Sequence, residues 1–271
     1  MFRGYCSSHR PHFPHWLTPT MLLVLAAWSL LVPSHAVEPL TDRIDSSDAV
    51  TRISDRIYRI GDVLIDKAQG CLYMPAKVNM TEGVVELLAC GRLGKRHESV
   101  LVVDAKPLHV QLALLLLGLE PGGGLAYQGD PRTPQGDSVW IWAEWCVDNE
   151  WKLVRGEDLV LNYVNNKPMQ PTHWVFSGSE IVEGTFVASV EQSIVTTYHD
   201  PFTIIDNPLP TGADDTVYGA NKSILPEIGH KIVLILKRDK AEPVPLHSLL
   251  DTLDIRDKGV WKDEPQDTTS D

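Results

Sequence analysis

The chain has 271 residues, of which 43% are hydrophobic and 22% charged, proportions typical of a folded globular protein. It carries 24 basic and 36 acidic residues, a formal net charge of −12 at pH 7. Because phosphate groups are bound by clustered Lys and Arg, this acidic balance argues against nucleic acid as a partner and against tight docking on anionic lipid.

The first 36 residues have the features of a signal peptide. Arg3 and Arg10 form a positive, acid-free start, an apolar run follows at 21–32, and SHA at 34–36 supplies small residues for cleavage. The apolar run is shorter than the roughly 20 residues that a membrane-spanning helix needs. We therefore expect residues 1–36 to be removed and the mature protein to be periplasmic or extracellular, with no transmembrane segment. Without the two arginines, 22 basic residues remain against 36 acidic ones, a net charge of −14.

Three cysteines follow the leader: Cys71, Cys90 and Cys146. In an oxidising compartment they form either one disulfide and a free thiol or three buried thiols. Cys71 and Cys90 lie symmetrically about a predicted hairpin turn, so a disulfide between these two cysteines is one of the alternatives. Since an iron–sulfur cluster of the four-cysteine type needs one more thiol, we expect no such cofactor.

The polar segment 37–56 is predicted to be a linker or a short helix, because Val50, Ile53 and Ile57 recur at helical spacing. Short apolar runs then predict a hairpin at 63–74, which Pro75 should end, and a second one from strands 84–90 and 97–104. The strand at 84–90 is apolar on both faces, which is typical of a buried strand, with Glu86 as the exception.

One helix is predicted at 108–119, where Asp104 and Pro107 supply its start. Its surface is apolar almost all round, which is typical of a helix buried between layers. His109 in its first turn is interpreted as a structural histidine.

Further strands are predicted at 138–147, 174–176, 185–190, 193–198, 202–205 and 232–236. Together these elements predict a single β-rich α+β domain over 57–240. In it, antiparallel sheet layers pack like a sandwich with the one buried apolar helix. The charged segment 241–271 is predicted to be a mobile acidic tail.

The densest group of ionisable side chains set among apolar ones comprises Glu86, Lys95, His97 and Glu98. In a regular strand His97 and Glu98 point to opposite faces, so they are not expected to bind one metal ion together. Whether Glu86 shares a face with His97 or with Glu98 depends on a one-residue shift in register.

Carboxylate and imidazole groups are suitable general bases or metal ligands near neutral pH. The four residues are therefore candidates for a metal-dependent or carboxylate/histidine-based hydrolase. A divalent metal would be its cofactor, His97 its candidate ligand, and the pair His199 and Asp200 could be brought near by the fold. A structural role is the alternative: Glu86 and His97 would satisfy each other, and Lys95 would neutralise Glu98.

The strand at 138–147 is the most aromatic, and its alternation places Trp140, Trp142 and Glu144 on one face. If this face is open, the two indoles form a platform for a sugar ring or an aromatic ligand, with Glu144 beside it, because each indole combines a large apolar face with one donor. The alternative is that a second layer covers both tryptophans.

No G-x-S-x-G, P-loop, H-E-x-x-H or dinucleotide motif occurs in the chain. This favours a non-enzymatic exported domain that binds a glycan or a protein of the cell envelope. The hydrolase is kept as the alternative, so whether any catalysis occurs stays open.

Several segments resemble an exported bacterial family known by its YdjY-type domain. The likeness lies in RIGDVLIDKAQG (59–70), MPAKVNMTEGVVE (74–86), GKRHES (94–99), LALLLLGL (112–119), WVFSGS (174–179) and HDPFTIIDNPL (199–209). It spans nearly the whole of 57–240, and GKRHES followed by the leucine-rich helix is its most specific part. The resemblance implies an exported β-rich domain of the planctomycete and verrucomicrobial type and no established activity. The iron–sulfur label sometimes attached to this family is not carried over, since the cysteine clusters are missing.

Overall fold

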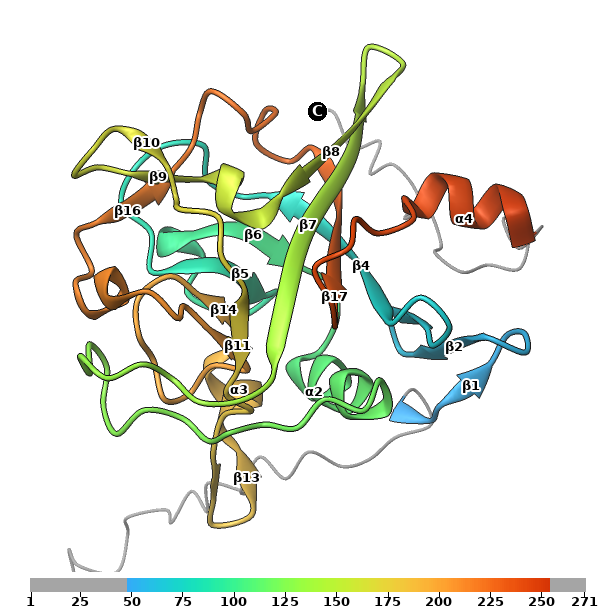
Figure 1. Ribbon diagram of the computed structural model, residues 1–271, viewed down its shortest axis with the longest axis horizontal. Helices are drawn as coiled ribbons and strands as arrows, with labels where there is room; N and C mark the ends of the chain where they lie inside the picture. Colours follow the sequence, from blue (N-terminus) through green and yellow to red (C-terminus); the bar gives the residue numbers. More distant parts are fainter. Residues whose placement is uncertain (1–47, 254–271) are drawn as a thin grey trace, which may run out of the picture. The chain divides into compact units, whose positions relative to one another are not determined.

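The structure, a computed structural model, describes residues 48–253, and strands dominate it (Figure 1). Eight of these strands form a closed ring in which each one pairs with two neighbours. In ring order they are β4 (Cys71–Val78), β17 (Lys231–Lys237), β7 (Ser138–Val147), β11 (Trp174–Phe176), β15 (Ile205–Asp206), β14 (Ser193–Thr196), β5 (Leu87–Gly91) and β6 (Ser99–Val103). The domain is therefore a closed β-barrel.

The predicted sandwich of antiparallel layers is wrong, and strand β4 shows why. Its first residues pair with β3 (Val63–Asp66), whereas Ala76 to Val78 pair with β6, so the sheet closes on itself. The change of partner occurs at Pro75, where the strand continues instead of ending. The carbonyl oxygen of Pro75 accepts the N–H of Asp104, the residue after β6, at 3.0 Å. Because proline has no backbone N–H, the change of partner leaves no donor of this residue unpaired. Alternation of apolar residues is common to sandwiches and barrels, so it could not distinguish them.

The predicted hairpin between residues 84 and 104 is also wrong, because β5 and β6 pair in parallel. Leu87 lies opposite Ser99, and Gly91 lies opposite Val103. The chain returns between them through a short loop and the 3-10 turn η2 (Arg96–Glu98). Strands β14 and β15 are parallel neighbours as well. Parallel strands begin at the same end of a sheet, so residues that precede β5 and β6 meet there.

The remaining elements extend or cover the barrel (Figure 1). They are β1 (Thr51–Arg52), β2 (Ile57–Ile60), β3 and β8 (Glu150–Arg155) beside the ring; β9 (Val160–Asn162), β10 (Lys167–Pro168) and β16 (Tyr218–Ala220) as a small sheet; the hairpin β12 (Ile181–Val182) and β13 (Thr185–Phe186); the 3-10 turns η3 (Gly156–Leu159) and η4 (Pro210–Ala213); and the helices α2 (Pro107–Leu116), α3 (Val187–Glu191) and α4 (Leu246–Leu253). Ile53 and Ile57, whose spacing made the segment 37–56 a candidate helix, thus lie beside and in strands.

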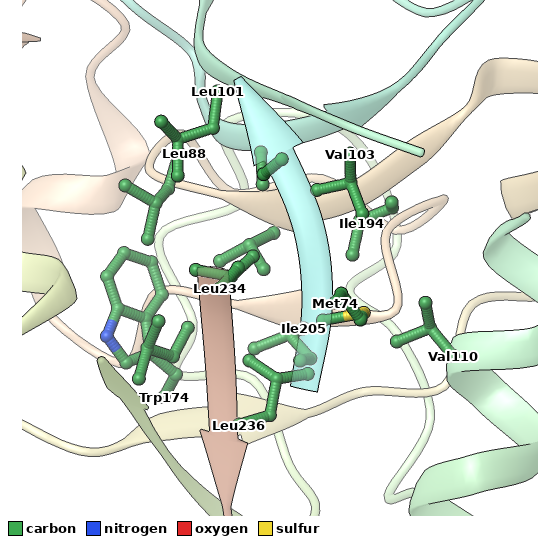
Figure 2. Close-up of a cluster of buried hydrophobic side chains, with 14 of the residues drawn as sticks. Met74, Leu88, Leu101, Val103, Val110, Trp174, Ile194, Ile205, Leu234 and Leu236 are labelled. Carbon is green, nitrogen blue, oxygen red and sulfur yellow. The ribbon is translucent and has the colours of Figure 1, made fainter. Parts of the chain in front are cut away.

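The barrel interior is filled by apolar side chains from its strands (Figure 2). Met74, Leu88, Leu101, Ile194, Leu234 and Leu236 are fully buried there. A ring of eight strands is just wide enough for side chains to fill, which fits this packing. Candidate functional groups therefore lie on the outer wall or at the ends of the barrel.

Helix α2 lies across one end of the barrel and does not sit between layers as predicted. Val110, Ala113 and Leu114 are buried in the core, but Leu115 and Leu116 are 42% and 38% exposed. A helix that closes the end of a barrel has one face open, so its all-apolar surface does not mean burial all round. We call this end the helix end, because α3, which leads into β14, lies against α2 there.

The packed structure continues past residue 240, where the mobile tail was predicted to begin. Leu246 and Leu249 of α4 are buried against a second apolar cluster on the outside of the barrel, which includes Ile57, Tyr73 and Ile235. The predicted signal peptide at 1–36, the segment 37–47 and the tail from 254 lie outside the described residues.

The open question of a disulfide is answered for all three cysteines. Cys71, Cys90 and Cys146 are free thiols, and the first two are buried. None of the helices within 48–253 has the length and apolar character needed to traverse a lipid bilayer.

Candidate functional site

The parallel pairing of β5 and β6 brings together the four charged residues singled out from the sequence. Lys95 Nζ lies 3.3 Å from Glu86 Oε2 and 3.1 Å from Glu98 Oε1. The backbone N–H of Glu86 donates to the carbonyl of Glu98 at 3.0 Å, which holds the two carboxylates side by side. We call Glu86, Lys95 and Glu98 the charged cluster. It lies where β5 and β6 begin, opposite the helix end.

His97 belongs to the rim of this cluster. Residues 96–98 form a turn and not a strand, so His97 and Glu98 do not point to opposite faces as expected. Nε2 of His97 lies 3.6 Å from Glu98 Oε2, and its side chain is 80% exposed. Across residues 48–253, no three His, Cys, Asp or Glu side chains gather in a way that would hold a metal ion.

The environment shifts the proton affinities within the charged cluster. Burial raises the pKa of Glu86, and the neighbouring charge of Glu98 raises it further, while Lys95 lowers it only in part. For Lys95, burial lowers the pKa, but hydrogen bonds and charges from Glu98 and Glu86 outweigh burial and leave the pKa raised. The cluster therefore pairs a protonated lysine with a carboxyl that holds its proton more tightly than an ordinary glutamate.

The segment that carries His199 and Asp200 adjoins the charged cluster, since Thr197 and Tyr198 both donate their N–H groups to the carbonyl of Glu86. Both side chains are buried and bond to nearby backbone. The imidazole of His199 is fully buried and donates from Nδ1 to the carbonyl of Asp130 at 2.6 Å. Asp200 accepts the N–H of Phe202 at 2.9 Å, the turn chemistry that a His-Asp-Pro sequence favours.

One ionisable group in this part of the barrel was missed. Asp206, at the end of β15, is fully buried. Burial raises its pKa to about 8, although its carboxylate accepts hydrogen bonds from Asn207 N–H and the Thr196 hydroxyl. The only signal in the sequence is an aspartate that interrupts the apolar strand TIID before Asn-Pro.

The alternation predicted for strand β7 is correct. Val139, Ile141, Ala143 and Trp145 face the core, and Trp140, Trp142 and Glu144 face outward. Trp140 and Trp142 are both partly exposed. The ring of Trp140 lies 6.1 Å from that of His173, and the guanidinium of Arg155 lies 5.2 Å from the Trp142 ring centre.

Glu144, by contrast, is not available beside the two tryptophans. Its side chain is 1% exposed and accepts the backbone N–H groups of Leu246 at 2.5 Å and His247 at 3.1 Å; it also contacts Nδ1 of His247. These N–H groups begin α4 and have no partner within the helix, so Glu144 caps the helix. Sequence reasoning missed this role because the capped helix lies about a hundred residues further along the chain.

Comparison with known proteins supports the likeness noted in the sequence. The YdjY domain family matches the chain over residues 63–237, well over half of its length. The chain belongs to this family. Its matched region runs from β3 to β17 and so contains the whole barrel, the charged cluster and the aromatic face of β7. No curated protein matches the chain, and neither does any solved structure.

The capping role of Glu144 predicts a loss of stability when its carboxylate is removed. Glu144→Ala leaves two N–H groups and His247 without their acceptor, so the free energy of unfolding should fall by about 1–3 kcal/mol. Urea denaturation measures the loss, and amide exchange should show α4 opening first. Glu150→Ala, on the exposed part of β8, is the control and should change little. Equal losses in both variants would contradict the capping role.

The raised pKa of Asp206 predicts a pH dependence. Between the ordinary value of 3.8 and about 8, the folded protein keeps a proton that the unfolded chain has released. This residue therefore lowers the free energy of unfolding as pH rises through that range. Asp206→Asn cannot titrate, so its stability relative to the wild type should improve from about pH 4 to about pH 8 and then level off. Urea denaturation across this range is the measurement, and Asp214→Asn, exposed and with a lowered pKa, should show no such trend.

Proposed function

We propose that this YdjY domain is a non-enzymatic binding domain of the cell envelope and that it binds a glycan on the outer face of β7. The features of a signal peptide at 1–36 support export to the periplasm or beyond. The observation that carries the proposal is the pair Trp140 and Trp142, which lie next to each other on the barrel wall and stay partly exposed.

The geometry of this face suits a carbohydrate. Alternate residues of a strand are about 7 Å apart on one face, so Trp140 lies next to Trp142, which packs partly against the second apolar cluster. His173 lies beside Trp140, while the guanidinium of Arg155 lies over the Trp142 ring and is held by Glu157. Glu144 is no longer counted in the site, because it caps α4. The net charge of −14 expected for the mature chain favours a neutral or basic glycan over a strongly anionic one.

Trp140→Ala is expected to weaken glycan binding by about tenfold, which corresponds to about 1.4 kcal/mol of lost stacking, while the fold survives. Cosedimentation with insoluble envelope polysaccharide and titration with its soluble fragments measure the effect. Tyr127→Ala is the control, since Tyr127 is 58% exposed and lies in the loop between α2 and β7. If Trp140→Ala unfolds the protein, the tryptophan is a core residue and the proposal fails.

A second candidate function, carboxylate-based hydrolysis, is favoured by the raised pKa of Glu86. A carboxyl whose pKa is raised above its ordinary value can act as a general acid, and Glu86 lies beside Lys95 and Glu98. Release of reducing ends or chromophores from a panel of glycosides is the assay. Glu86→Gln should reduce the rate at least a hundredfold, within the range expected for loss of a general acid, whereas His97→Ala should retain it. Absence of any turnover by the wild type would reject this candidate.

A further inference from the structure

Five large apolar side chains lie exposed at the helix end of the barrel. They come from α2, the hairpin β12–β13 and α3: Leu115 42%, Leu116 38%, Ile181 74%, Val182 50% and Val190 55% exposed. We call this set the end patch. Single exposed apolar residues are ordinary, but several on adjoining elements mark an interaction surface.

The elements that carry the end patch adjoin one another. Helix α3 begins directly after β13 and lies against α2. Figure 1 shows the hairpin projecting beyond the barrel beside these two helices. Since the buried residues of α2 already fill the end of the barrel, Leu115 and Leu116 have no place inward and contribute to the outer surface.

The projecting hairpin is held firmly. Its turn residues Glu183 and Gly184 have φ angles of 50° and 81°, the left-handed values of a tight two-residue hairpin turn. At its base the hydroxyl of Ser179 donates to the carbonyl of Phe202 at 2.7 Å and accepts the N–H of Ala188 at 3.1 Å. Ile181 and Val182 are thus presented on a preorganised support, which reduces the entropy that a partner must overcome.

The charge on the hairpin and on α3 is of one sign. Glu180, Glu183 and Glu191 are exposed on the hairpin and α3. No lysine or arginine occurs between Lys167 and Lys222, so the hairpin and α3 carry no basic residue. Such a border repels anionic lipid and a second copy of itself, and it attracts a surface that carries Lys and Arg.

We infer that the end patch docks a partner protein whose contact surface has an apolar recess bordered by Lys and Arg. Ile181 on the hairpin, 74% exposed, is the anchor, and the three glutamates pair with the basic border. An apolar centre surrounded by a polar rim is the usual anatomy of a protein–protein interface. This surface lies on α2, the hairpin and α3, whereas the proposed glycan face lies on β7.

Site-specific photo-crosslinking in the producing bacterium tests the inference on the full exported chain. A photoreactive amino acid at position 181 should give one principal protein adduct. The crosslinked peptide of that partner, identified by mass spectrometry, should be rich in Lys and Arg. The same probe at Val164, which is 78% exposed in the loop between β9 and β10, is the control and should not give this adduct.

Variants that reverse the charge of the glutamates or remove the apolar anchor distinguish the inferred contact from nonspecific crosslinking. The adduct should fall at least tenfold with Glu180→Lys combined with Glu183→Lys. With the identified partner purified, Ile181→Asp should weaken binding by a similar factor while thermal unfolding is unchanged. An adduct to a second copy, an adduct that survives charge reversal, or flotation of the wild type with vesicles of phosphatidylethanolamine and phosphatidylglycerol would each overturn the inference. Loss of glycan binding in Trp140→Ala has no bearing on these outcomes.

Discussion

The pairing of β4 with β6 is the contact on which the rest of the structure depends. Through it a sheet that would otherwise have two open edges becomes a closed ring, and its interior becomes a packed apolar core. Pro75 marks the point where β4 exchanges β3 for β6, and its carbonyl bonds to Asp104. Closure satisfies backbone groups that an open edge would leave to water or to another chain.

Closure also determines where chemistry can lie. Because core side chains fill the barrel, polar groups gather at its ends, and the parallel pair β5 and β6 concentrates them at one end. Glu86 and Glu98 each precede one of these strands, so Lys95 can contact both. The opposite end is covered by α2 and α3, which leave an apolar surface outside. The two ends therefore differ in character, one charged and one apolar with an acidic border.

The outer wall shows how tertiary contacts assign different roles to residues of one strand face. Trp140, Trp142 and Glu144 alternate along β7 and point the same way. The helix α4 packs beside this face and engages Glu144 as its cap, while Trp140 stays partly open to solvent. A carboxylate and two indoles that look like one site in the sequence thus separate, because Glu144 is a buried helix cap and the indoles stay partly exposed.

The sequence by itself determined the local features: the strand over 138–147 and its inward and outward faces, the helix after Pro107, the membership of the YdjY family and the residues of the charged cluster. These follow from periodicity and composition, which act over a few residues. Only the tertiary structure decided that the sheet closes, that β5 and β6 run in parallel, and that Glu144 caps α4. Each of these depends on contacts between distant segments, where pairing partner and direction are set by the packing of the whole core and leave no signature in the local pattern.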